Sequence, residues 1–218
     1  MIRQVHTLIS KELNLEWRHK AAFAGIFLYL ISSVFVCYLT FDGLIDNKTW
    51  NALFWIILLF ASLHAVLKSF TQETDGRMLY YYILVSPQAL VISKIIYNAI
   101  FMIILSLIGL FVYMAFMGSP IEQMSLFVVN MLAGVIGLSS IMSLVSAIVS
   151  KVKNNVTLMG ILSFPLVLPL LLVLIRVSYA SLFAGHMAEY LGDLLVIILL
   201  TCVTFVLSVI LFPFIWKD

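Results

Sequence analysis

The stretch IIYNAIFMIILSLIGLFVYMAFM, residues 95–117, runs for 23 residues without a charged side chain. An α-helix needs about 20 apolar residues to cross the roughly 30 Å hydrocarbon core of a bilayer. The run is continuous rather than alternating, which disfavours the strand of a membrane barrel, whose pattern alternates over about 9–11 residues. Residues 95–117 therefore predict a transmembrane helix.

Five further runs on either side of this one satisfy the same criterion. Of the 218 residues, 64% are hydrophobic and 10% are charged, whereas a soluble domain carries about 25% charge. A soluble fold of this length would leave much apolar surface in water, which the hydrophobic effect opposes. The sequence predicts one all-α, polytopic membrane domain over residues 1–218, in contact with the lipid bilayer and not with nucleic acid. The six predicted spans are residues 21–41, 50–68, 95–117, 125–149, 156–175 and 194–215.

The positions of the basic residues predict the orientation of these spans. If the N-terminus is cytoplasmic, ten of the twelve lysines and arginines fall inside, and Lys48 and Arg176 fall outside. The positive-inside rule counts Lys and Arg and largely ignores acids, so it predicts that both termini are cytoplasmic. The ten are Arg3, Lys11, Arg18, Lys20, Lys68, Arg77, Lys94, Lys151, Lys153 and Lys217.

The segment before the first span has a helical pattern of its own. Its apolar residues recur at steps of three and four, with charged residues between them. This pattern predicts an amphipathic helix over residues 1–20 that lies in the membrane interface, near anionic headgroups. A solvated N-terminal arm is the alternative. The apolar residues are Ile2, Val5, Ile9, Leu13 and Trp17.

Two prolines interrupt the predicted span 156–175. Pro165 and Pro169 each remove a backbone donor and clash with the preceding turn. In lipid the freed carbonyls need another partner. We therefore expect a kinked or broken helix that packs against its neighbours.

Polar residues inside the predicted spans are few. Asn98, Asn130 and His64 lie in spans, and no acid lies at mid-depth, which argues against an ion-driven carrier. Hydrogen bonding between helices is the expected role of both asparagines. His186 is expected outside the spans, either at a ligand surface or as a plain interfacial residue. No nucleotide-binding loop, catalytic motif or metal-ligand spacing is present in the sequence. We therefore predict that the chain is not an enzyme and binds no cofactor or metal directly.

The polar insert QETDGRMLYYYILVSP, residues 72–87, separates two of these spans on the predicted cytoplasmic side. Glu73 and Asp75 precede Gly76, and apolar residues then follow at helical spacing up to Pro87. Tyrosine and arginine are enriched at interface hot spots, so the insert is typical of a short helix that docks against another protein. The tyrosines could instead form an aromatic belt at headgroup level. Since the chain has neither a nucleotide fold nor a midplane ion site, a transporter built this way would need a separate ATPase.

Four stretches resemble the CcmB family, the haem exporter protein B subunit of the cytochrome c maturation complex. They are KELNLEWR (11–18), FWIILLFASLHAVLKSFTQETDGRMLYYYILVSPQALVISKIIYN (54–98), LSSIMSLVSAIVSKVKNNVTLMGILSFPLVLPLLL (138–172) and PFIWKD (213–218).

The resemblance implies an ABC-2-type permease subunit of the bacterial inner membrane. It implies a CcmA-like ATPase, CcmC-like and CcmD-like membrane subunits, and two permease copies, with haem as a cargo of the complex. By the same resemblance, the insert is a cytoplasmic coupling helix that contacts the ATPase. The residues carried over are Glu73, Asp75, Gly76, Arg77, Leu79, Tyr81, Tyr82 and Pro87.

Two alternative functions remain open from the sequence. An ABC-2-type permease for a lipid, polysaccharide or drug would share the whole architecture. A membrane scaffold that binds a partner without gating would also explain the insert.

Overall fold

The computed structural model describes residues 2–18, 20–42, 45–71, 86–149, 155–183 and 187–217. Within these ranges the regular structure is entirely helical, and six helices are long and apolar enough to cross a membrane. The predicted all-α fold with six spans is thereby confirmed. The elements are α1 (Ile2–Arg18), α2 (Lys20–Phe41), α3 (Asn47–Thr71), α5 (Pro87–Met117), α6 (Met124–Val149), α7 (Asn155–Ala180), the short 3-10 helix η1 (Met187–Tyr190) and α8 (Leu191–Lys217).

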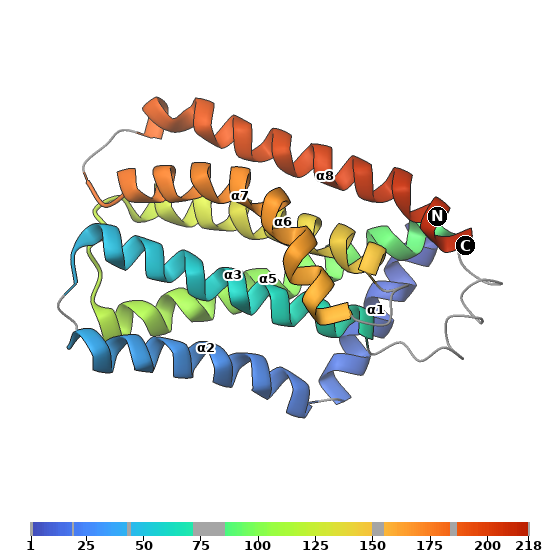
Figure 1. The fold of residues 1–218 in the computed structure, drawn as a ribbon, viewed down its shortest axis with the longest axis horizontal. Coiled ribbons are helices and arrows are strands. Elements are labelled where there is room, and N and C mark those ends of the chain that lie inside the picture. Colours follow the sequence, from blue (N-terminus) through green and yellow to red (C-terminus); the bar gives the residue numbers. More distant parts are fainter. Residues whose placement is uncertain are drawn as a thin grey trace.

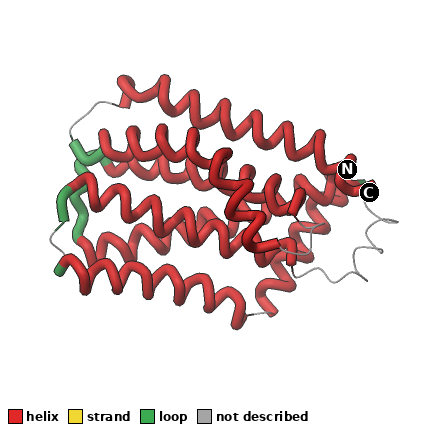
Figure 2. The backbone as a smooth tube through the Cα atoms, viewed as in Figure 1, coloured by secondary structure: helices red, strands yellow, loops and turns green. Residues whose placement is uncertain are grey.

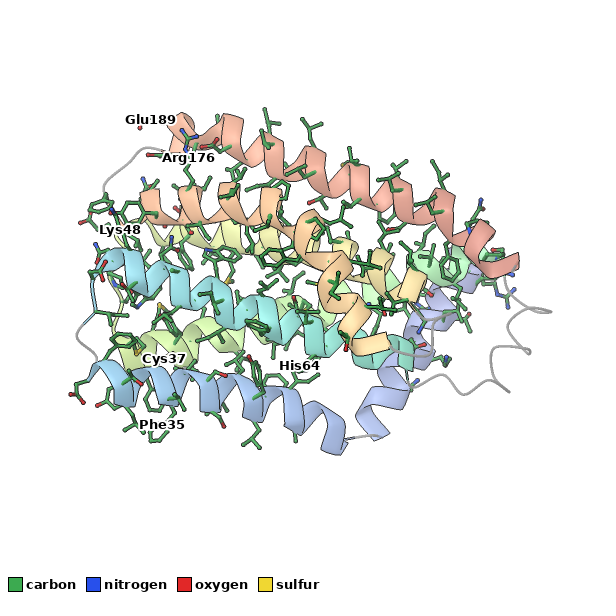
Figure 3. The ribbon with its side chains drawn as sticks, viewed as in Figure 1. Phe35, Cys37, Lys48, His64, Arg176 and Glu189 are labelled. Carbon is green, nitrogen blue, oxygen red and sulfur yellow. The ribbon has the colours of Figure 1, made fainter. Side chains whose placement is uncertain are left out.

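The six long helices run side by side along the longest axis of the molecule (Figure 1). Both chain termini lie at one end, which we call the terminal end; it also carries α1 and the start of α5 at Pro87. At the opposite, far end the described connecting residues appear as loop (Figure 2). Lys48 and Arg176 lie at this far end (Figure 3). The arrangement agrees with an even number of spans, while the side that faces the cytoplasm stays a prediction.

Helix α6 is the centre of the bundle. Of the span Met124–Val149, 78% is buried inside the protein, against 17% of Ala24–Phe41 in α2. Gly134 explains part of this close packing, because a Cβ added there would lie 2.5 Å from Leu174 Cδ2 of α7 and 3.0 Å from Trp55 Cη2 of α3. Small residues at such contacts let helix backbones approach in membranes. The remaining small residues on buried positions of α6 are Gly137, Ser139, Ser140, Ser143, Ser146 and Ala147.

Helix α5 begins earlier than the sequence predicts. The expected span starts at residue 95, but the helix starts at Pro87 and continues for 31 residues to Met117. Proline suits this first position because its missing N–H has no intrahelical partner there. At 1.5 Å per residue the helix is about 46 Å long, more than the roughly 30 Å of hydrocarbon. Its first turns therefore extend beyond the expected hydrocarbon core at the terminal end.

Both prolines of α7 lie inside a single helix. The helix is continuous from Asn155 to Ala180 and contains Pro165 and Pro169. Figure 1 shows that the ribbon of α7 changes direction partway along its length. Leu170, immediately after the second proline, is buried and packs in the core.

Asp46 caps the first turn of α3. Its Oδ2 accepts hydrogen bonds from the backbone N–H groups of Lys48 (3.2 Å) and Thr49 (3.3 Å), and the Thr49 hydroxyl donates to Oδ1. An N-cap carboxylate satisfies donors that the first helical turn leaves open. The hydrogen bonds with Thr49, side chain first and then backbone, lower the pKa of Asp46 below its ordinary value of 3.8.

We expect Asp46→Ala to lower the melting temperature of the detergent-solubilised protein by about 1–3 °C at pH 7. Because the folded pKa lies below 3.8, the carboxylate stabilises the folded state fully above that pH, and the contribution disappears as pH falls through the folded pKa. The difference between the two proteins should therefore shrink in melting curves recorded at successively lower pH. A difference that is independent of pH would contradict the role of the ionised cap.

Candidate functional site

Most of the predicted docking segment lies outside the residues that the structure describes. Ser86 and Pro87 are described, and they stand at the start of α5. Helix α3 ends at Thr71, so the segment joins two helices that both contribute to the hydrophobic core. His186 also lies outside the described residues. The predicted docking residues that lie outside the described residues are Glu73, Asp75, Gly76, Arg77, Leu79, Tyr81 and Tyr82.

Helix α1 packs against the beginning of α5 at the terminal end. Ser86 Oγ donates to Gln4 Oε1 over 3.4 Å, and Lys94 Nζ lies 4.0 Å from Glu12 Oε1. Between these two contacts, Leu8 of α1 is buried in the core. Positions 4 and 12 are thus matched with 86 and 94, so α1 and the first two turns of α5 run in the same direction.

Lys94 is an unusual residue for this position because it is only 1% exposed. Glu12 also pairs with Lys11, at 3.0 Å between Nζ and Oε1. A buried ammonium group requires a paired charge or hydrogen bonds, since its transfer from water into protein is strongly unfavourable. The junction between α1 and α5 is therefore ionic as well as apolar.

One turn further along α5, a polar contact reaches α6. Asn98 Nδ2 donates to Ser143 Oγ over 2.9 Å, and Ser139 Oγ donates to the Ile95 carbonyl over 3.3 Å. These bonds give Asn98 the interhelical role that the sequence predicts for it. They also fix α5 to the central helix of the bundle.

A second polar cluster ties α3 to α7 near the far end. Trp55 Nε1 donates to Ser178 Oγ (2.7 Å), and the Ser178 hydroxyl has two acceptors within reach, Asn51 Oδ1 (2.8 Å) and the Leu174 carbonyl of its own helix (2.7 Å). Asn51 Nδ2 in turn donates to the Ile175 carbonyl (2.9 Å). The three side chains are buried, and each of them satisfies a polar atom of another in a region where water is excluded.

Asn130 adds α6 to this far-end cluster. Its Nδ2 donates to the Leu174 carbonyl over 3.0 Å, as the sequence predicts for an interhelical asparagine. Its Oδ1 is buried and has no hydrogen-bond partner among the described residues. Nearby, Tyr113 donates to the Trp50 carbonyl (2.9 Å), and the Trp50 indole donates to the Gly118 carbonyl (3.1 Å). Side chains thus hold α3, α5, α6 and α7 together at this end.

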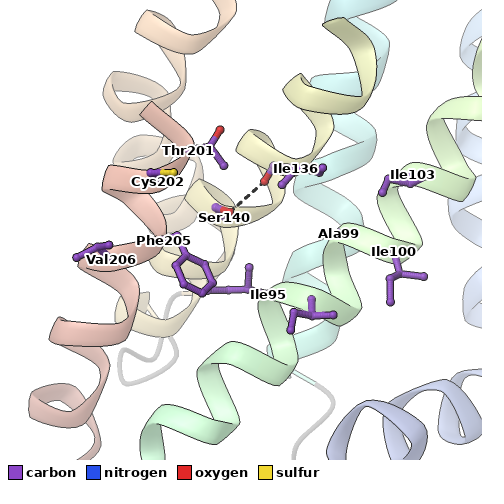
Figure 4. A pocket seen from close by; sticks show the side chains of 11 residues that line it. Ile95, Ala99, Ile100, Ile103, Ile136, Ser140, Thr201, Cys202, Phe205 and Val206 are labelled. Carbon is purple, nitrogen blue, oxygen red and sulfur yellow. Dashed lines mark hydrogen bonds between the residues drawn. The ribbon is translucent and has the colours of Figure 1, made fainter. Parts of the chain in front are cut away.

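An apolar groove of about 340 Å³ opens between α5, α6 and α8 (Figure 4). Isoleucines of α5, including Ile100, form one wall, and Phe205 of α8 forms another. The hydroxyls of the groove are already bonded to their own helices: Ser140 to the Ile136 carbonyl (3.0 Å) and Thr201 to the Ile197 carbonyl (2.8 Å). Such walls suit hydrocarbon rather than a charged ligand.

His64 lies apart from these clusters, on the exposed side of α3 (Figure 3). Its ring meets Tyr29 of α2 edge to face, with 5.1 Å between centroids. No group of three or more His, Cys, Asp or Glu side chains that could hold a metal ion occurs in the part of the chain that the structure describes.

Sequence reasoning did not find the α1–α5 junction or the cluster of Asn51, Trp55 and Ser178. The partners in the cluster are more than 120 positions apart in the chain, so no local pattern reveals them. The junction had a weak signal. Lys94 is a charged residue directly before the apolar run 95–117, and Glu12 is an acid in the amphipathic segment before the first span. Their pairing becomes visible only when α1 is seen to pack on α5.

Comparison with known proteins gives a family match. A search of curated proteins returned no match. A model of the CcmB protein family matches residues 3–215, which is almost the whole chain. The family forms the membrane component of a haem exporter of the ABC type. From this match, together with the six spans, we conclude that the chain belongs to the CcmB family.

Proposed function

We propose that this protein is the permease subunit of an ATP-driven complex that delivers haem for the assembly of c-type cytochromes. The observation that carries the proposal is the family match over residues 3–215. The six long apolar helices are consistent with it. Hydrolysis of ATP is assigned to a separate CcmA-like subunit, and CcmC-like and CcmD-like subunits and a second permease copy complete the proposed complex.

The ATPase is proposed to act on residues 72–87, which lie between α3 and α5 in the sequence and include the first residue of α5. Both helices contribute to the core, and α5 is hydrogen-bonded to α6 through Asn98. A displacement at the segment would therefore reach the centre of the bundle. Rigid-body tilting of packed helices is an established form of such a transition.

Haem is proposed as a cargo of the complex rather than as a group bound by this chain. The histidines of the sequence are scattered, without a paired arrangement that suggests axial ligands. The proposed location is the bacterial inner membrane with both termini in the cytoplasm. Ten of the twelve basic residues support that orientation under the positive-inside rule.

Deletion of the gene, followed by measurement of cytochromes with covalently attached haem, tests the proposed function. We expect those cytochromes to be lost and to return when the full chain is supplied again. Measurement of apocytochrome levels serves as the control for a general loss of expression. Normal amounts of attached haem after deletion would refute the cytochrome role and favour a permease for another cargo.

We expect Glu73→Lys and Gly76→Val to weaken co-purification of the ATPase by about tenfold, the effect of losing roughly 1.4 kcal/mol at an interface. The matched control is Glu122→Lys, which makes the same charge change at an exposed residue of the far end. Membrane insertion should be unchanged in all three variants. Equal co-purification from all of them would exclude the docking role of the segment. A non-gating scaffold would instead show co-purification without any dependence of ATP hydrolysis on the permease.

A further inference from the structure

We propose that Lys94 is a positioning residue that couples α1 to α5 through Glu12, so that the two helices move as one body. The coupling itself is a property of this chain alone. Its use in transport rests on the proposed function, in which an ATPase moves residues 72–87 and thereby the start of α5.

We call the contacts between α1 and the start of α5 the clamp, and they are evenly spaced along both helices. Gln4 meets Ser86 and Glu12 meets Lys94, with a separation of eight residues on each helix. Leu8 is buried halfway between them. Two helical turns are therefore held at both ends by polar contacts and in the middle by apolar packing, which restricts sliding as well as separation.

A charge at position 94 is not needed for packing. Lys94 is 1% exposed, and a methionine of similar length would fill much the same space without the desolvation of an ammonium group. Among the described side chains of α1, the charged ones that face Lys94 include Glu12, at 4.0 Å, and Lys11, which itself pairs with Glu12. A buried ion pair contributes little net stability compared with an apolar replacement, and in some proteins such a pair fixes the register of the elements that carry it. Register is what a coupling contact requires.

Lys94 also lies at the correct point along α5. Asn98 follows it by four residues, one helical turn away on the same side of the helix, and it bonds to Ser143 of α6. Consecutive turns of α5 are thus tied to α1 by Lys94 and to the central helix by Asn98. A movement of the beginning of α5 would be transmitted to α1 at the surface and to α6 in the interior.

Hydrogen exchange of the full chain in lipid nanodiscs tests the clamp without any partner. We expect Lys94→Met and Glu12→Gln each to speed exchange in residues 2–18 by about fivefold, the loss of a partly buried ion pair. Lys94→Arg keeps the charge and should stay within about twofold of the wild type. Arg3→Met removes a positive charge from an exposed position of α1 and should also change nothing. Unchanged protection of α1 in both Lys94→Met and Glu12→Gln would overturn the proposal.

A double variant, Lys94→Met with Glu12→Gln, separates coupling from mere stability. It leaves neither charge of the pair buried without its partner, so α6 should keep wild-type protection while α1 stays fast. If hydrogen exchange in α6 is also faster than in the wild type, the pair supports the whole fold and the coupling role is refuted.

The transport role is then measured in the complete complex. We expect Lys94→Met and the double variant each to reduce covalently attached haem by at least about fivefold. Co-purification of the ATPase should be unchanged in both. Lys94→Arg, which keeps the charge, should give the wild-type amount of attached haem. Wild-type output from the double variant would refute the transport role of the clamp. If cells lacking the gene attach haem normally, the proposed function fails, but the exchange experiment still decides whether α1 is clamped.

Discussion

Replacing Gly134 with valine is expected to destabilise the folded protein by about 3 kcal/mol and to lower its yield from the membrane. Even the Cβ of alanine would lie 2.5 and 2.8 Å from the two methyl carbons of Leu174 and 3.0 Å from Trp55 Cη2. The Leu174 side chain could shift at modest cost, but the indole of Trp55 is rigid and is held by its hydrogen bond to Ser178. Valine adds two further carbons to this space.

The magnitude of the Gly134→Val effect follows from overpacking. Inserting carbons into a packed core destabilises by about 1–3 kcal/mol and sometimes more. Native proteins have only about 5–15 kcal/mol of stability in total. We expect a loss near the upper end, about 3 kcal/mol, because the clash involves both α7 and α3.

Gly160→Val is the matched control for this substitution. Gly160 lies in α7, and a Cβ there would meet nothing within 4 Å. Because glycine is a poorer helix former than valine, this change should be neutral or stabilising by less than about 0.5 kcal/mol. The monodisperse yield and the melting temperature in detergent measure both variants. Equal behaviour of the two would contradict the close approach at Gly134.

Ser178→Ala is expected to lower stability by about 2 kcal/mol, since it leaves the buried Trp55 N–H without an acceptor and removes a donor that Asn51 Oδ1 shares with the Leu174 carbonyl. The estimate exceeds the roughly 0.6 kcal/mol average for a hydrogen bond between membrane helices. Here one hydroxyl serves two partners on α3, and its loss affects both.

Ser208→Ala is the control for the loss of a buried hydroxyl. Ser208 is also buried, but its Oγ donates over 2.8 Å to the Thr204 carbonyl of its own helix, α8. Its removal should change stability by less than about 0.5 kcal/mol. Chemical denaturation of the solubilised proteins, followed by the fluorescence of Trp55 and its neighbours, gives both values. A smaller effect for Ser178→Ala than for Ser208→Ala would show that the far-end cluster is not cooperative.

The sequence predicts the spans of this protein well because hydrocarbon crossing is a local property of the chain. Each of the six runs became a helix that contains or nearly contains the expected residues. The start of α5 is the largest difference, eight residues before the predicted boundary. Hydropathy marks where a helix enters hydrocarbon. The helix itself can begin several residues earlier, and α5 begins at Pro87.

Most contacts between helices could not be predicted from the sequence. The pattern of Ile2, Val5, Ile9, Leu13 and Trp17 predicts an amphipathic helix but does not distinguish a lipid surface from another helix, since both are apolar. In the structure Leu8 is buried in the protein core, while Leu13 is 45% exposed. The docking residues from Glu73 to Tyr82 remain a prediction, since they lie outside the described residues.

The dense surroundings of α6 restrict how this membrane domain could change shape. Because α6 touches its neighbours through glycine and serine, drawing them apart would open voids that neither lipid nor water could fill favourably. Helix α2, by contrast, presents most of its side chains to the outside, where fluid acyl chains readjust at little cost. A working cycle is therefore expected to move α6 together with the helices it touches as one packed body, with peripheral helices such as α2 sliding past it by small shear displacements.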